Sequence, residues 1–187
     1  MTGPADDFRP LGRGAEFSLA NKLERIAWQL VWLLLARATP PQLAGWRRLL
    51  LRLFGAKVGA GAKIYGSVRI WLPRNLEIGE GALVGPGAEL YNQGRIAIGP
   101  HCVISQRAFL CASTHDTSDS AFALETRPIA LGRGCWVAAE AFVGPGVTMG
   151  DGAVLAARGA LFEDAAAMGI YRGNPAALVR HRRFGAR

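Results

Sequence analysis

The residue of this sequence that is best suited to acid–base chemistry is His115, which stands in the string "STHD". A neutral imidazole can take the proton of a hydroxyl group near neutral pH, because histidine titrates near about 6.5. The alternative is that His115 only caps a turn. The two other histidines are His101, inside a regular repeat, and His181, in a basic tail. Since a three-histidine zinc site needs every one of them to converge, we expect no bound metal.

A repeat of six residues must position this histidine. Aliphatic residues begin units such as "IGEGAL", "VGPGAE" and "IGPHCV". Neither the 3.6-residue period of a helix nor the two-residue period of a strand fits them. A six-residue period with glycine-rich corners instead predicts a parallel β-helix. Its interior should be filled by the aliphatic residues, among them Ile98, Ile104, Leu110, Leu131, Val137, Val143, Met149, Leu155 and Leu161.

The fifth residue of the units is small, as a tight corner requires, with Arg74 as the clear exception, and two of the three cysteines occupy this position. We therefore expect Cys102 and Cys135 to be compact core residues and not nucleophiles or ligands. No role follows for Cys111. An odd number of cysteines without the spacing of a disulfide framework favours a reducing compartment.

The repeat is interrupted by a polar segment that contains His115. The interruption predicts a loop of residues 114–127 that projects from a corner of the third coil, and loops on rigid scaffolds are where chemistry concentrates. Asp116 and Asp119, in the same loop, could orient His115 or hydrogen-bond a substrate. They could equally be ordinary turn residues.

Longer strings carry a resemblance to a known family: "LYNQGRIAIGPHCVISQRAFLCASTHD", "FVGPGVTMGDGAVLAARG" and "YRGNPA". Over about residues 46–176 the sequence is similar to hexapeptide-repeat acyltransferases, and most to acetyltransferases of colanic-acid-type exopolysaccharide clusters. The resemblance implies an all-β repeat, a left-handed parallel β-helix of about five coils with an N-terminal α-helical segment and the projecting loop. It also implies a homotrimer that binds acetyl-CoA and its acceptor in clefts between subunits.

The same resemblance implies roles for individual residues. His115 would be the catalytic base, and Asn92, in "LYNQG", would help to bind the acceptor. The alternative for Asn92 is that it satisfies its own corner. The expected contacts with acetyl-CoA come from an aromatic residue along the pantetheine arm, two small residues that offer backbone groups, and a cation for the phosphates: Trp136, Ala139, Ala157 and Arg172. Trp136 could instead lie at the edge of the core, and Arg172 could be simply solvated.

Positive charge is concentrated at the two ends of the chain. Residues 1–57 carry nine Lys/Arg against four Asp/Glu, residues 58–170 carry eight against ten, and residues 171–187 carry five against none. These three ranges are the expected N-terminal helical segment, acyltransferase domain and basic tail. Basic ends favour an anionic surface, and we expect a membrane and not nucleic acid. A solvated tail is the alternative for the last arginines.

The N-terminal segment contains an amphipathic helix, with Trp28 and Trp32 expected to widen its apolar face. Its apolar run is shorter than the roughly 20 residues that span a bilayer. The helix should therefore lie on a membrane surface or cap the open end of the β-helix. The remaining residues of the apolar face are Leu19, Leu23, Ile26, Leu30 and Leu34.

These features together predict an O-acetyltransferase that transfers acetyl from acetyl-CoA to a sugar hydroxyl in exopolysaccharide biosynthesis. Two alternatives stay open: an N-acetyltransferase of a nucleotide sugar or amino acid, and a non-catalytic β-helix assembly module. We expect a cytoplasmic protein, peripheral on the inner face of the plasma membrane. Its acceptor would be a sugar or a polyprenyl-linked oligosaccharide.

Overall fold

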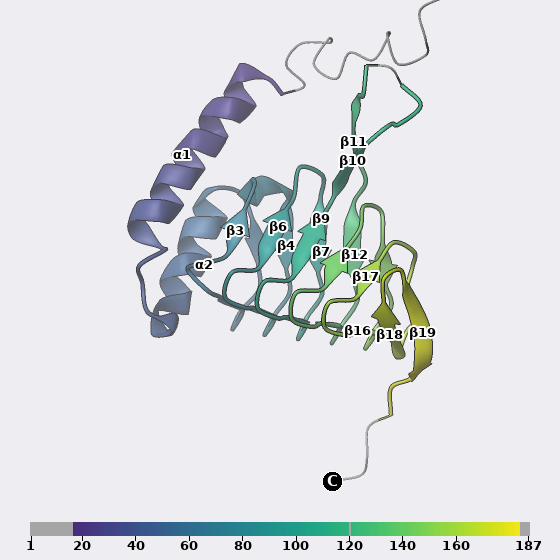
Figure 1. The fold of residues 1–187 in the computed structure, drawn as a ribbon. Helices are drawn as coiled ribbons and strands as arrows, with labels where there is room; N and C mark the ends of the chain where they lie inside the picture. Colours follow the sequence, from purple (N-terminus) through teal and green to yellow (C-terminus); the bar gives the residue numbers. More distant parts are fainter. Residues whose placement is uncertain (1–16, 120, 184–187) are drawn as a thin grey trace, which may run out of the picture.

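In the computed structural model, residues 17–119 and 121–183 are described, and they form a triangular parallel β-solenoid with two helices at one end (Figure 1). Within these ranges the solenoid makes five complete turns and part of a sixth. The predicted left-handed parallel β-helix of about five coils is confirmed. Residues 1–16 of the predicted N-terminal segment and residues 184–187 of the predicted basic tail lie outside the described residues.

Three sheets form the walls of the solenoid, and each turn contributes one strand to each wall. The first sheet contains β1 (Lys57–Val58), β4 (Leu76–Ile78), β7 (Ile96–Ile98), β12 (Ile129–Leu131) and β15 (Thr148–Met149). The second contains β2 (Lys63–Ile64), β5 (Leu83–Val84), β8 (Val103–Ile104), β13 (Trp136–Val137), β16 (Val154–Leu155), β18 (Gly169–Gly173) and β19 (Ala176–His181). The third contains β3 (Arg69–Ile70), β6 (Glu89–Tyr91), β9 (Phe109–Cys111), β14 (Phe142–Val143) and β17 (Ala160–Leu161).

The geometry of one turn explains the six-residue period. The first residue of a unit points inward and is fully buried, as at Ile104 and Val137. The fourth residue turns the corner in the left-handed backbone region, which favours glycine. Five described residues other than glycine hold the same conformation at this position, with φ between 57° and 59°: His101, Arg107, Glu140, Arg158 and Met168.

The cysteines at corner positions are structural, as predicted. Cys102 and Cys135 are fully buried, and their thiols donate to the carbonyl oxygens of Gly132 and Gly150, at 2.9 and 3.1 Å. Their small side chains fill corners that stack on one another in consecutive turns.

The helices α1 (Leu19–Leu35) and α2 (Ala44–Leu53), joined through the short 3₁₀ helix η1 (Pro41–Leu43), close the open edge of the first turn. A free edge of a sheet presents unpaired backbone groups. Here side-chain N–H groups of the helices satisfy its carbonyl oxygens. Among the described residues the pairs are Trp28 with Ile70, Trp32 with Val68, Arg47 with Ile64, Arg48 with Ala62, and Arg52 with Val58.

This cap corrects the expected orientation of α1. Trp28 and Trp32 are buried against the first turn, whereas Leu23 and Leu30 are more than half exposed. At 100° per residue the tryptophans and the leucines occupy opposite faces of the helix. The tryptophans face inward because their indole N–H groups can satisfy the carbonyls of the sheet edge, which leucine cannot do. No helix within the described ranges is long and apolar enough to cross a membrane.

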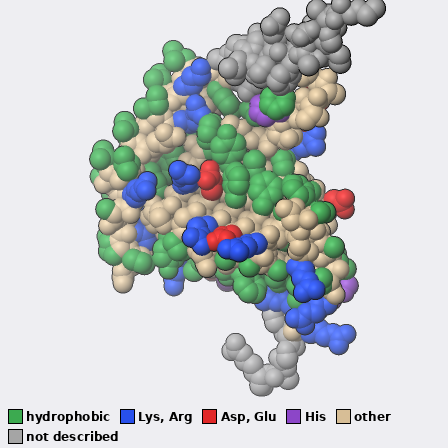
Figure 2. Space-filling model, in the orientation of Figure 1, with side chains coloured by type: hydrophobic (Ala, Val, Ile, Leu, Met, Phe, Trp, Pro, Cys, Tyr) green, Lys and Arg blue, Asp and Glu red, His purple; other side chains and the backbone are tan. Residues whose placement is uncertain are grey.

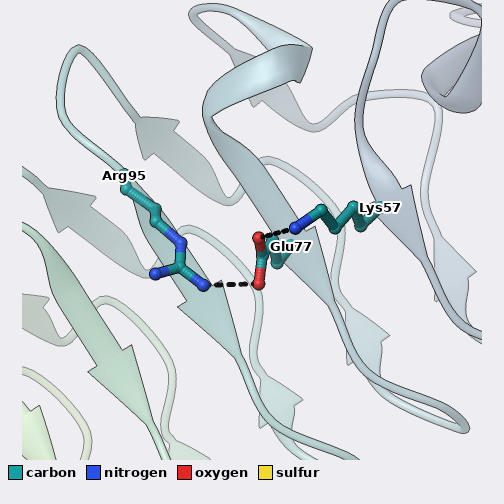
Figure 3. A network of polar contacts seen from close by, with 3 residues as sticks. All are labelled: Lys57, Glu77 and Arg95. Atoms are coloured by element: carbon teal, nitrogen blue, oxygen red, sulfur yellow. Dashed lines mark hydrogen bonds and ion pairs between the residues drawn. The ribbon is translucent and has the colours of Figure 1, made fainter.

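Ion pairs tie successive turns together on the outside of the first sheet. Glu77 lies between Lys57 and Arg95, at 2.8 Å and 2.7 Å (Figure 3). Two hydrogen bonds, the larger effect coming from Lys57 and the next from Arg95, hold the pKa of Glu77 below its ordinary value. This network therefore stabilises the fold above the unfolded-state pKa and loses its effect as the pH falls through the lowered one. Because the cations are largely exposed, the contribution is small.

Candidate functional site

The polar interruption forms a β-hairpin, where the sequence predicted only a loop. Its strands β10 (Ser113–His115) and β11 (Leu124–Thr126) pair antiparallel, with His115 opposite Leu124. The hairpin leaves the corner between the third and first sheets, in the third turn, and projects away from the solenoid (Figure 1). The prediction of a segment projecting from a corner of the third coil is confirmed.

Gly94, in the turn before the hairpin, packs closely against the base of the hairpin. A Cβ atom at Gly94 would lie 2.7 Å from the carbonyl oxygen of Ala112 and 3.1 Å from Cβ of Thr126. Both atoms belong to the base of the hairpin. The absence of a side chain at residue 94 therefore lets the hairpin sit directly on the second turn.

Substituting Gly94→Ala should displace the hairpin, because backbone at 2.7 Å cannot yield as a flexible side chain can. We expect turnover to fall about 10- to 100-fold, since small misplacements of a reacting group carry such costs. Steady-state kinetics measures this, with Gly45→Ala as the control. Gly45 lies in α2, where a Cβ would meet only Arg48 Nη2, at 3.6 Å. If both variants retain full turnover, the close contact between Gly94 and the hairpin does not contribute to catalysis.

The imidazole of His115 is held by Phe122, in the loop of its own hairpin just before β11. Its Nδ1 lies 2.7 Å from the carbonyl oxygen of Phe122, and its ring stacks on the Phe122 ring at 4.2 Å. A carbonyl oxygen can only accept a hydrogen bond, so Nδ1 carries the proton, and in the neutral imidazole the lone pair is then on Nε2. This is the tautomer that a base acting through Nε2 requires.

Asp116 and Asp119 hold the turns of the hairpin. Asp116 Oδ1 accepts hydrogen bonds from the N–H and hydroxyl of Ser118, which lower the pKa of this carboxyl. Asp119 Oδ1 accepts from the N–H of Ala121. Among the described residues neither carboxylate contacts His115, whose orientation comes from Phe122.

Asn92 lies at the same edge of the solenoid as the hairpin, in the turn before it, but its side chain points inward. It is fully buried. Its Oδ1 accepts from the N–H groups of Trp71 and Leu72, and its Nδ2 donates to the carbonyl of Leu72. These bonds brace the corner, as the alternative for Asn92 expected, and its contact with an acceptor stays a prediction.

The residues expected to contact acetyl-CoA lie at another edge. Trp136 stands on the outside of the second sheet, 44% exposed, with its indole N–H donating to Ser105 Oγ. Ala139 and Ala157 occupy consecutive turns of the corner between the second and third sheets. Within the described residues, the backbone N–H groups of both alanines have no hydrogen-bond partner. They are therefore available to a ligand. Arg172 is exposed on β18.

Charged side chains stack along this second corner, and sequence reasoning did not single them out. Glu140 pairs with Arg158, at 2.7 Å, and with Arg107. Arg158 and then Arg107 hold the pKa of Glu140 below its ordinary value, so the carboxylate stays ionised. Two arginines against one carboxylate leave a positive edge beside Ala139 and Ala157.

The predicted site residues therefore lie at two edges of one chain. The corner between the third and first sheets carries the hairpin with His115, whereas the corner between the second and third sheets carries Ala139 and Ala157. The width of the third sheet separates them. Sequence reasoning missed Phe122, which orients His115. An aromatic residue within a polar segment was the available signal.

Comparison with known proteins places the chain among acetyltransferases. It is 42% identical over 166 residues to WcaF of Escherichia coli (strain K12), named as a colanic acid biosynthesis acetyltransferase, and the match covers 89% of this chain and 91% of that protein. A maltose O-acetyltransferase from Clostridium difficile 630 has a TM-score of 0.80 at 19% identity, covering 89% of this chain and 90% of that one. A hexapeptide-repeat acetyltransferase from Vibrio cholerae O1 biovar eltor, solved with acetyl coenzyme A, has a TM-score of 0.82 at 17% identity, covering 98% and 100%. No protein-family model matches the chain.

Proposed function

The chain belongs to the WcaF-like colanic acid biosynthesis acetyltransferases, and from this premise we propose that it transfers acetyl from acetyl-CoA to a sugar hydroxyl in exopolysaccharide biosynthesis. The observation that carries the proposal is the hydrogen bond from His115 Nδ1 to the Phe122 carbonyl, because it leaves Nε2 as a free base. The solved relatives support the substrates, since one is named for O-acetylation of maltose and another holds acetyl coenzyme A.

In the proposed reaction, His115 Nε2 removes the proton of the sugar hydroxyl as its oxygen attacks the thioester carbonyl carbon. The tetrahedral intermediate collapses with cleavage of the carbon–sulfur bond, and the imidazolium returns the proton to the departing thiolate. Thiolate is a good leaving group, so no covalent enzyme intermediate is needed. The free N–H groups of Ala139 and Ala157 fit the carbonyl groups of the pantetheine arm.

The test is release of free thiol from acetyl-CoA in the presence of a panel of sugars, amino sugars and amino acids. An O-acetyltransferase should release thiol with neutral sugars and form a product that alkali hydrolyses, whereas an amide would survive. Thiol release with amines alone would favour the N-acetyltransferase alternative. If no acceptor gives thiol release while an active relative, assayed in parallel, does release thiol, the non-catalytic assembly module is favoured.

We further propose that the enzyme is a homotrimer in which His115 of one subunit faces Trp136 or Ala157 of its neighbour. The support is that His115 and the residues expected to contact acetyl-CoA lie at two separate edges of one chain. A second copy of the chain can bring one edge of each kind together at an interface. A cyclic arrangement repeats the same contact at every interface.

Complementation tests this arrangement. His115→Ala removes the base, and Ala157→Arg should block the pantetheine arm, so each variant alone should be inactive. Co-expressed in equal amounts, they should recover about one quarter of wild-type activity, because one site in four receives both intact halves at random. Co-expression of His115→Ala with His115→Asn is the control and should recover nothing. Mixed oligomers without recovered activity would place both halves in one chain.

A polyprenyl-linked oligosaccharide is the acceptor that we propose, with the enzyme peripheral on the inner face of the plasma membrane. A groove of about 510 Å³ supports a sugar acceptor, since it lies between α1 and the third sheet and contains Trp71, Tyr91 and Arg69. Aromatic rings beside polar groups suit a sugar, which offers both apolar C–H faces and hydroxyl groups.

A further inference from the structure

Exposed apolar side chains gather on the helical cap. Of the sixteen large hydrophobic residues that are exposed within the described ranges, eleven lie between Leu19 and Leu53. Scattered exposed leucines are ordinary, but a contiguous apolar surface indicates an interaction site. Among the described residues, the cap therefore has an apolar surface that no other part of the chain covers.

The centre of this surface is one stripe of α1, which we call the apolar face. At 100° per residue its members fall within one side of the helix, opposite Trp28 and Trp32. The far side of α1 is occupied by the first turn, so the apolar face is turned away from the solenoid; Figure 2 shows green side chains over α1 at the left margin. Its members, between 51% and 72% exposed, are Leu19, Leu23, Ile26, Leu30, Leu33 and Leu34.

The helix α2 extends the surface. Trp46 donates its indole N–H to the carbonyl of Leu35, at 2.8 Å, which joins the two helices at the end of α1. Leu49 and Leu53 follow Trp46 on one side of α2 and are 46% and 70% exposed. A flat partner could therefore touch both helices.

The charge of the cap selects the kind of partner. Residues 17–57 contain seven Lys/Arg and a single acid, Glu24. Arg47 is buried and Lys57 is paired with Glu77, which leaves five cations that are at least partly exposed on the cap. Glu24 is paired with Arg74, at 2.8 Å, and does not offset the others. A second copy placed face to face would bring like charges together. An anionic bilayer instead complements them.

We propose that the apolar face docks the enzyme on the surface of an anionic lipid bilayer. The leucines enter the boundary between headgroups and acyl chains, while the surrounding cations contact lipid phosphates. The first turn then faces the membrane through a helical layer about 10 Å thick. The hairpin with His115 leaves the third turn, about 10 Å farther on at the spacing of strands. The reacting centre would thus stand about 20 Å above the bilayer, within reach of a lipid-linked oligosaccharide.

Flotation with phosphatidylglycerol-containing vesicles tests the docking with the full-length chain. We expect the wild type to float at low salt and to float less at high salt, because salt screens the charge component. Ile26→Gln with Leu30→Gln should weaken binding about 10-fold or more, since two half-exposed aliphatic side chains no longer enter the bilayer. Glutamine favours helices, so α1 should be retained, which circular dichroism checks.

The matched control is Leu178→Gln with Val179→Gln, two residues of β19 with similar exposure, both 46%. This variant should float like the wild type. Equal flotation of both variants would overturn the proposal, and so would a wild type that stays in the soluble fraction at low salt. A smaller oligomer in sedimentation of the Ile26→Gln, Leu30→Gln variant would also overturn it, because the apolar face would then bind a second copy. Thiol release with a soluble sugar should be unchanged in both variants, which separates this result from a failure of the proposed acetyl transfer.

Discussion

Replacing His115 with alanine should lower turnover by about 10²- to 10⁴-fold, the usual cost of removing a general base. The variant should still fold and bind acetyl-CoA, because His115 is only part-buried and contacts its own hairpin. Thiol release under saturating substrate measures the loss, and equilibrium binding of acetyl-CoA shows that the second edge of the site is intact. The pH dependence of the variant's residual turnover should no longer show the ionisation of the histidine base.

The control is His181→Ala, because His181 is exposed on β19 and lies outside both halves of the site. It should leave turnover unchanged. Turnover of the His115→Ala enzyme close to that of the wild type would remove the base from the mechanism. The hydrogen bond to Phe122 would then serve only to close the hairpin.

The second large effect is expected on stability. Arg47 is 1% exposed, and its guanidinium donates to the carbonyls of Ile64, Thr39, Pro40 and Pro41 and to the hydroxyl of Thr39. Burial lowers the pKa of Arg47, and this network of oxygens offsets the cost of burying the cation. Arg47→Ala should lower the free energy of unfolding by about 3 kcal/mol or more, because each buried oxygen left without a donor costs about 1–3 kcal/mol.

Thermal unfolding measures this effect, with an expected fall in Tm of about 10 °C for a chain of this size. Arg47→Lys should recover little, because one ammonium cannot reach the directions that a planar guanidinium serves. Arg48→Ala is the matched control on the same helix, since within the described residues Arg48 makes one hydrogen bond, to the carbonyl of Ala62, and its loss should cost about 1 kcal/mol. Equal Tm values for the two alanine variants would show that the network around Arg47 adds nothing to the cap.

The solenoid follows from the sequence because its pattern is local and repeated. An aliphatic residue at every sixth position must face the interior of some closed turn, and no other common period accommodates it. The same reasoning predicts the buried corners at Cys102 and Cys135. The break at residue 114 likewise indicates a projecting segment, and chemistry alone directs attention to its histidine.

For residues outside the six-residue repeat, the direction in which a side chain points could not be predicted from the sequence and was decided by the tertiary structure. The helix α1 has apolar residues on two opposite faces, and hydrophobicity alone cannot decide which one is buried. The carbonyl edge of the first turn decides it, because Trp28 and Trp32 supply N–H groups and Leu23 and Leu30 do not. Asn92 turns inward for a similar reason, since the backbone of Trp71 and Leu72 engages its amide. The tautomer of His115 depends on the Phe122 carbonyl, seven residues away, which only the closed hairpin brings within hydrogen-bonding distance.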